Sequence, residues 1–149
     1  MRAVVQLVRD ASVETEGRVS GKIETGLLVY LGVARGDARE DAQYLAEKIA
    51  TLRIFDDSEG RINLSVQDVQ GGVLALSQFT LLADARKGRR PSYSSAASAE
   101  TAKPLYEYFM EQIRAQGLPC EGGVFQTHMQ VKYTNDGPVT ILLDSRKNF

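Results

Sequence analysis

The chain of 149 residues has few of the side chains that usually form catalytic and metal sites: one cysteine, Cys120, one histidine, His128, and no tryptophan. A single cysteine excludes an intramolecular disulfide bond, which favours a reducing compartment. Zinc sites usually combine several His or Cys ligands at set spacings, so we expect no metal and no cofactor. A Ser-His-Asp triad would depend on His128, whose neighbouring hydroxyl, Thr127, would point away from it in a strand. An enzyme of this sequence must therefore use other groups.

Long apolar runs are also missing. The segment LLVYLGVA, Leu27 to Ala34, is far too short to span a bilayer, and the opening MRAVVQLVRD lacks the apolar stretch of a signal peptide. The composition, 43% hydrophobic and 25% charged, is typical of one compact soluble domain. We therefore expect a single cytoplasmic domain over residues 1–149, with no membrane partner.

The net charge of −1 argues against a protein that coats nucleic acid. Positive charge is nevertheless concentrated in the segment ARKGRRP, which contains Arg86, Lys87, Arg89 and Arg90. Two interpretations remain open. The segment is either a solvated basic turn or a patch that contacts RNA phosphates and binds in a salt-dependent way.

The hydrophobic pattern predicts a mixed α/β domain with two main helices and an extensive sheet. Asp37 and Glu40 resemble a capping box at the start of the first helix, and Ser98 and Gly117 mark the limits of the second. One layer of helices cannot cover so much apolar strand, so we expect two packed, barrel-like sheets or a second subunit. The expected strands are residues 2–9, 11–16, 26–33, 71–82 and further segments within 124–144.

The segment SQFTL, residues 77–81, places polar side chains at the end of an apolar strand. Strand alternation would put Gln78 and Thr80 on one face, with Ser77 and Phe79 on the other. Each polar group that is buried without a partner costs about 1 to 3 kcal/mol. Either the strand emerges into solvent here, or these side chains line a binding site.

The segment NDGPVT, residues 135–140, first suggests a hairpin turn, since Asp-Gly is a strong turn signal and a proline that begins the next strand loses no ladder bond. However, Gly137-Pro138 is a pair whose peptide bond is cis in roughly 5 to 6% of cases. A cis bond would turn two successive carbonyls the same way, with no side chain in front of the glycine. Nearby, His128 and Met129 are expected to be ordinary strand residues.

Taken together, SQFTL and NDGPVT give the chain a resemblance to the D-aminoacyl-tRNA deacylases. The resemblance extends over the whole length, through AVVQ, DASV, GLLVYLGV, RIFDD, GRRPSY and MQV. It implies an enzyme that cleaves the ester between a D-amino acid and the terminal ribose of tRNA, and that removes glycine from the tRNA for alanine. It also implies a homodimer with the active site at the subunit interface.

The resemblance assigns roles to particular residues. The pocket floor would be Ser77, Gln78, Phe79 and Thr80, with the substrate's 2′-hydroxyl assisting hydrolysis and main-chain groups of Phe79 and Thr80 stabilising the developing charge. A Thr80 nucleophile ranks second, because no base is identifiable near it, and a non-catalytic nucleic-acid binding module is a further alternative. Gly137 and Pro138 would enter from the neighbouring subunit and reject L side chains, with support from Met129, Asn135 and Thr140, while tRNA would contact Arg86, Lys87, Arg89 and Arg90.

One position departs from the family pattern. The family usually reads VQRV where this chain reads VQLV, so Leu7 replaces an arginine expected to steady the Gly-Pro loop. Arg2 and Arg9 are the candidates to compensate. Arg9 lies two residues along the strand and therefore on the same face as Leu7, whereas Arg2 does not.

Overall fold

The computed structural model describes all 149 residues. A five-stranded sheet has the strand order β6-β5-β2-β1-β7, in which β2, β5 and β6 run parallel and β1 is antiparallel to both neighbours. The strands are β1 (Arg2–Thr15), β2 (Arg18–Gly32), β3 (Phe55–Asp56), β4 (Ile62–Leu64), β5 (Gly72–Ser77), β6 (Cys120–Gly122) and β7 (Gln130–Asp144). The helices are α1 (Arg39–Thr51), α2 (Ala99–Ala115) and the short 3-10 helix η1 (Phe79–Leu82). The predicted mixed α/β architecture with two main helices is confirmed.

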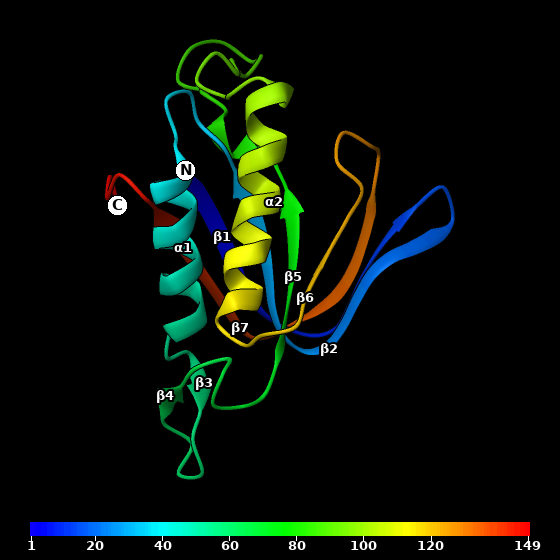
Figure 1. Ribbon diagram of the computed structural model, residues 1–149, viewed down its shortest axis with the longest axis vertical. Helices are drawn as coiled ribbons and strands as arrows, with labels where there is room; N and C mark the ends of the chain where they lie inside the picture. The colour runs from blue at the N-terminus through cyan, green and yellow to red at the C-terminus, as the bar shows by residue number, and fades with distance from the viewer.

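Both α-helices lie side by side against one face of the sheet (Figure 1). Leu27 and Val29 of β2 pack with Val73 and Ala75 of β5 in a core cluster that also contains the inner faces of the helices. Residues 27–29, within the predicted strand 26–33, are fully buried, so β2 is covered on both faces at this point. The helical residues in this core are Ala42, Leu45, Ala46, Ile49, Ala50, Ala102, Leu105, Tyr106, Phe109 and Ile113.

A second, smaller core lies on the opposite face of the same sheet. Leu28 and Leu74, whose side chains alternate with the residues of the first core, pack there with Val8 and Ala11 of β1. Asp10 has a left-handed φ of 51°, so the alternation of β1 reverses at this residue. Figure 1 shows the far ends of β1 and β2 sweeping away from the helices. The chain thus contains one large sheet and the two-stranded sheet β3–β4, rather than two large packed sheets.

Several predicted element boundaries are wrong. Residues 2–9 and 11–16 belong to one strand, β1, and the adjoining segment 18–25 is the first half of β2, so the two form a long antiparallel hairpin. The predicted strand 71–82 ends at Ser77, where the chain turns into η1. The second helix is bounded as predicted, with Ser98 as N-cap and Gly117, at φ +84°, just beyond its end.

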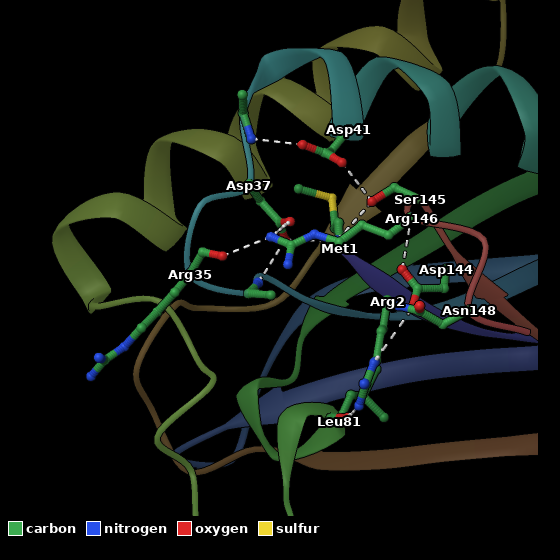
Figure 2. A network of polar contacts seen from close by, with 12 residues as sticks. Met1, Arg2, Arg35, Asp37, Asp41, Leu81, Asp144, Ser145, Arg146 and Asn148 are labelled. Carbon is green, nitrogen blue, oxygen red and sulfur yellow. Dashed lines mark hydrogen bonds and ion pairs between the residues drawn. The ribbon is translucent and has the colours of Figure 1, made fainter.

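The start of α1 differs from the predicted capping box of Asp37 and Glu40. The N-cap is Ala38, whose backbone N–H donates to Asp41 Oδ2 at 2.8 Å. Asp37 is instead buried and lies 2.7 Å from the ammonium group of Met1 (Figure 2). Because a buried carboxylate requires an opposite charge and hydrogen bonds, Asp37 is held in this network rather than at the helix end.

No helix in the structure combines the length and apolar character needed to cross a membrane.

Candidate functional site

The segment SQFTL forms a strand end followed by a helical turn. Ser77 is the last residue of β5, Gln78 is the N-cap of η1, and Phe79 and Thr80 begin the turn. The predicted alternation of these side chains along a strand is therefore wrong from Gln78 onward. The change of geometry matters, because the first N–H groups of a helical turn have no partner within the turn and remain available as donors.

Gly32, at the end of β2, allows η1 to pack directly on the sheet. A Cβ atom at this position would lie 2.5 Å from Leu82 Cδ2 and 3.0 Å from the carbonyl oxygen of Gln78. The Gln78 N–H also donates to the Leu31 carbonyl at 2.8 Å. Sequence reasoning missed Gly32, and its position directly after the apolar run 27–31 was the available signal.

A cavity of about 580 Å³ opens beside this turn. Ser77, Gln78 and Phe79 line it together with Tyr30, His128 and Met129, although Thr80 does not. Phe79 is 55% exposed, and its ring makes an edge-to-face contact with the ring of Tyr93, with 5.1 Å between centroids. This wall of apolar and aromatic groups with a few polar ones is typical of a small-molecule pocket.

The Thr80 hydroxyl is hydrogen-bonded to an amide group and not to a base. Gln78 Nε2 donates a hydrogen bond to Thr80 Oγ1, so the threonine hydroxyl has an amide rather than a carboxylate or imidazole as its partner. Burial and the neighbouring Tyr133 raise the pKa of Tyr30, so its phenol stays protonated near neutral pH.

NDGPVT is a protruding loop within one strand, and the predicted hairpin turn is wrong. Asn135 pairs with Val8 and Thr140 pairs with Gln6, both on β1, so β7 continues in the same direction on either side. Residues 136–139 therefore bulge out opposite the single residue Leu7. The Gly137-Pro138 peptide bond is cis, and both residues are exposed.

Asn135 closes the base of this loop. Its Nδ2 donates to the carbonyl of Leu7 and to that of Val139, both at 3.0 Å. Gln6 Nε2 donates to Thr140 Oγ1 at 3.1 Å and to Asn135 Oδ1 at 3.4 Å. Asn135 and Thr140 thus contact the loop base as residues that can support it, whereas Gln6 was missed, although it is a polar residue within an apolar strand.

Arg9, rather than Arg2, contacts the Gly-Pro loop. Its Nε lies 2.9 Å from Asp136 Oδ2, directly before Gly137, and the pair is solvent-exposed. Leu7, on the strand between Gln6 and Val8, is buried in the main core.

Within one chain the two motifs lie in different cavities. Gly137 and Pro138 line a second cavity of about 600 Å³ with Leu7, Arg9 and residues of the β3–β4 region. Ser77, Gln78 and Phe79 line the first cavity with Met129, and neither cavity contains residues of both motifs. The single chain therefore brings Met129 to the SQFTL pocket but leaves the Gly-Pro loop apart from it.

The basic segment forms an exposed loop closed by a bridge between Asp84 and Ser92. Arg86 is engaged within the loop, because its Nε and Nη2 donate to the two carboxylate oxygens of Asp84 at 2.8 and 2.7 Å. This pairing holds the pKa of Asp84 far below its usual value. Lys87, Arg89 and Arg90 form no ion pair, and of the four basic residues they alone remain free to meet an anion.

No group of three or more His, Cys, Asp or Glu side chains is arranged to hold a metal ion.

Comparison with known proteins agrees with these features. A model of the D-Tyr-tRNA(Tyr) deacylase family matches residues 4–144. Proteins named D-aminoacyl-tRNA deacylase from Koribacter versatilis and Desulforamulus reducens are 65% and 59% identical, each over the full length of both chains. The chain belongs to the D-Tyr-tRNA(Tyr) deacylase family.

Solved structures give the same fold. One described as c-Myc DNA Unwinding Element Binding Protein superimposes with a TM-score of 0.90 at 39% identity, covering 97% of this chain and 98% of the other. A probable eukaryotic D-amino acid tRNA deacylase has a TM-score of 0.80 at 18% identity, covering 96% and 98%, and this likeness concerns the fold alone.

Proposed function

We propose that the protein hydrolyses the ester of D-aminoacyl-tRNA, releasing the free D-amino acid and tRNA. The observation that carries this proposal is full-length similarity, at 65% identity, to a protein named for this activity. The two motifs support it, since one lines a cavity beside η1 and the other forms an exposed loop.

In this proposal the ester carbonyl sits at the first turn of η1. Water adds to the carbonyl carbon, the negative charge develops on the carbonyl oxygen, and the bond to the ribose oxygen then breaks. The N–H groups of Phe79 and Thr80 suit the stabilisation of that oxygen, because they begin a helical turn and their positions are fixed in advance. The substrate's neighbouring 2′-hydroxyl orients the water and relays its proton to the departing ribose oxygen, so that the products are the free amino acid and the intact terminal ribose.

Stereochemical selection would come from the Gly137-Pro138 loop of a second copy of the chain. The two cavities are separate within one chain, so a homodimer in which each loop enters the other subunit's pocket would unite the motifs. The exposed backbone of this loop would then collide with the side chain of an L-amino acid. In a D-amino acid or glycine the α-carbon carries only a hydrogen atom on that side, and this hydrogen would fit. The same geometry predicts removal of glycine from the tRNA for alanine.

A deacylation assay tests the activity directly. Matched tRNA carrying D-tyrosine, L-tyrosine or glycine is incubated with the protein, and release of the amino acid is followed. We expect rapid release of D-tyrosine and glycine, with L-tyrosine released only at the spontaneous rate. Intact D-tyrosyl-tRNA after prolonged incubation would refute the proposal.

Mixing two inactive variants tests the exchange of loops. Gly137→Ala would inactivate the loop that a subunit inserts into its partner. Phe79→Ala would inactivate the subunit's own pocket. In mixed dimers one of the two pockets would receive intact parts from both chains, so a one-to-one mixture should regain about a quarter of wild-type activity. No recovery, in a mixture shown to exchange subunits, would place both motifs of each site on the same chain.

A Thr80 nucleophile is the alternative mechanism. It predicts that Thr80→Ala abolishes activity and that a substrate ending in 2′-deoxyadenosine is still cleaved. The RNA-assisted mechanism predicts the reverse, and it is favoured because Thr80 Oγ1 contacts the Gln78 amide and no basic group.

A non-catalytic nucleic-acid binding module is the alternative function. The structural relative named for DNA binding and the exposed basic loop favour it. Release of the amino acid, measured beside tRNA binding, separates the two, since a pure binding module would retain the tRNA with its ester intact.

A further inference from the structure

Arg2 is the first residue of β1, and this end of the strand lies beside η1. Its backbone pairs with Gly32 of β2 on one side and with Asp144 of β7 on the other, so its Cα position is fixed from both directions. The adjoining Met1 is buried, and its ammonium group lies 2.7 Å from Asp37 (Figure 2). The base of the Arg2 side chain is therefore part of a rigid corner of the sheet.

The side chain connects this corner to the catalytic turn. Arg2 Nη1 donates to the carbonyl oxygen of Leu81 at 3.1 Å, and its Nε lies 3.8 Å from Asp144 Oδ2 (Figure 2). The Asp144 carboxylate is itself buried and fixed, because it accepts the Arg146 N–H at 2.9 Å and Asn148 Nδ2 at 2.8 Å. The guanidinium group is thus held between a fixed carboxylate and η1.

The hydrogen bond from Arg2 is made near the C-terminal end of η1, at Leu81. The last carbonyls of a helical turn lack partners within the turn, and Arg2 supplies one for Leu81. Phe79 is two residues earlier, about 4 Å along the axis of a 3-10 helix. In so short a turn, a tilt at Leu81 moves the N–H groups of Phe79 and Thr80 as well, and catalytic geometry tolerates displacements of only about 0.5 Å.

We propose that Arg2 is a positioning residue that orients η1 for hydrolysis, an inference that rests on the proposed deacylase function. Arg2 does not line the cavity formed by Ser77, Gln78 and Phe79, so its proposed effect is exerted through η1. Together with Arg9 it gives β1 a double role. One strand fixes the SQFTL turn through Arg2 and contacts the Gly-Pro loop through Arg9.

The test compares Arg2→Ala, Arg2→Lys and a control, Arg18→Ala, in which an exposed arginine without an ion pair is removed from β2. Release of D-tyrosine from tRNA is measured with and without millimolar ethylguanidinium, at a temperature at which all variants are folded by circular dichroism. We expect Arg2→Ala to lower kcat about tenfold or more with KM nearly unchanged, because about 1 Å of misplacement can cost as much as a hundredfold. Ethylguanidinium should restore part of the rate, and Arg2→Lys should be intermediate.

Because all variants are compared while folded, a loss of stability alone would not lower kcat at an unchanged KM. An unchanged kcat in Arg2→Ala, a loss confined to KM, or a loss that ethylguanidinium does not reverse would each overturn the inference. These outcomes leave the proposed function standing as long as the wild-type protein releases D-tyrosine. An inactive wild-type protein would instead refute the proposed function itself.

Discussion

Asn135 Nδ2 donates a hydrogen bond to the Leu7 carbonyl at 3.0 Å and joins the loop of β7 to the one residue of β1 that the loop leaves unpaired. A second hydrogen bond from the same Nδ2 reaches Val139 at the other end of the loop. One amide group thus supplies a donor for the unpaired Leu7 carbonyl opposite the bulge and holds the two ends of the loop at a fixed separation.

Replacing Asn135 with Ala should lower both stability and activity. Two carbonyls lose their donor, so we expect the free energy of unfolding to fall by about 1 to 3 kcal/mol, together with a larger loss of D-aminoacyl-tRNA hydrolysis. Urea unfolding and deacylation assays measure the two effects. Thr134→Val is the control, since Thr134 directly precedes Asn135, is exposed, and lies outside the hydrogen bonds at the loop base. Equal behaviour of the two variants would contradict the role assigned to Asn135.

Gly137→Ala should abolish D-amino acid release. Gly137 has φ +117°, and an added Cβ would lie 2.7 Å from Val139 Cγ2 and 2.9 Å from the Val139 nitrogen, so the loop must shift. Gly60→Ala is a matched control, because Gly60 also has a positive φ, +74°, and open space around it. Both substitutions should cost about 1 to 3 kcal/mol of stability, but only Gly137→Ala should lower the deacylation rate. A fully active Gly137→Ala would remove the loop from the site.

The Arg9–Asp136 pair should contribute little to stability. Both side chains are well exposed, so a double-mutant cycle with Arg9→Met and Asp136→Asn should give a coupling energy of about 0.2 to 1 kcal/mol at low salt. The coupling should largely vanish at about 1 M salt, where screening is strong. If the pair compensates for Leu7, Arg9→Met should reduce the preference for D over L substrates more than it reduces stability. An unchanged preference would leave Leu7 without compensation.

The basic loop should bind tRNA through three of its four cations. Single alanine substitutions of Lys87, Arg89 and Arg90 should each reduce the slope of log affinity against log salt by roughly 1. Arg86→Ala should have a smaller effect, because Asp84 already neutralises Arg86. Filter binding of tRNA over a series of salt concentrations gives the slopes. Equal slopes for all four variants and the wild type would exclude the loop from the tRNA interface.

Stability should fall in acid because of carboxylates near the ends of the chain. Burial opposes ionisation of Asp41 and Asp144, but hydrogen bonds, from Ser145 to Asp41 and from the Arg146 N–H to Asp144, outweigh it and hold both pKa values below the usual 3.8. Since both pKa values are lower in the folded protein, the stabilisation is complete above about pH 4 and is lost as pH falls through the folded values.

Urea unfolding measured at a series of values between about pH 2 and about pH 7 tests this expectation. Asp41→Asn and Asp144→Asn should each flatten the acid limb of the stability profile, whereas Glu16→Gln, in an exposed turn, is the control. An acid limb that neither Asp variant alters would assign the pH dependence to other groups.

Much of the fold follows from local patterns in the sequence. The two main helices and the strand over residues 26–33 were predicted correctly, because helical and strand periodicity reflect burial directly. The boundaries failed where tertiary contacts override local preference. Asp10 continues β1 in a left-handed conformation, and η1 ends β5 early because Gly32 lets the turn pack on the sheet.

Some residues of the candidate site could be recognised from the sequence, and others only from the structure. SQFTL and NDGPVT were recognisable because they are contiguous segments, and Arg9 could be chosen over Arg2 from strand alternation alone. Gln6 and Gly32 escaped notice, since their importance depends on neighbours distant in the chain, Thr140 and Leu82. The free charges of the basic loop likewise emerge only once the pairing of Arg86 with Asp84 is known.

The α/β class, the two helices and the residues of both motifs follow from the amino-acid sequence, because each is encoded within a short stretch of chain. That NDGPVT is a bulge within a strand, and that β1 contacts both motifs, follows from the folded arrangement of distant segments. Register and long-range hydrogen bonds, such as Gln6 to Thr140, link residues more than a hundred positions apart and leave no local pattern to read. The separation of the two motifs into different cavities is also a property of the folded chain, and it supports the proposal that a second copy completes the site.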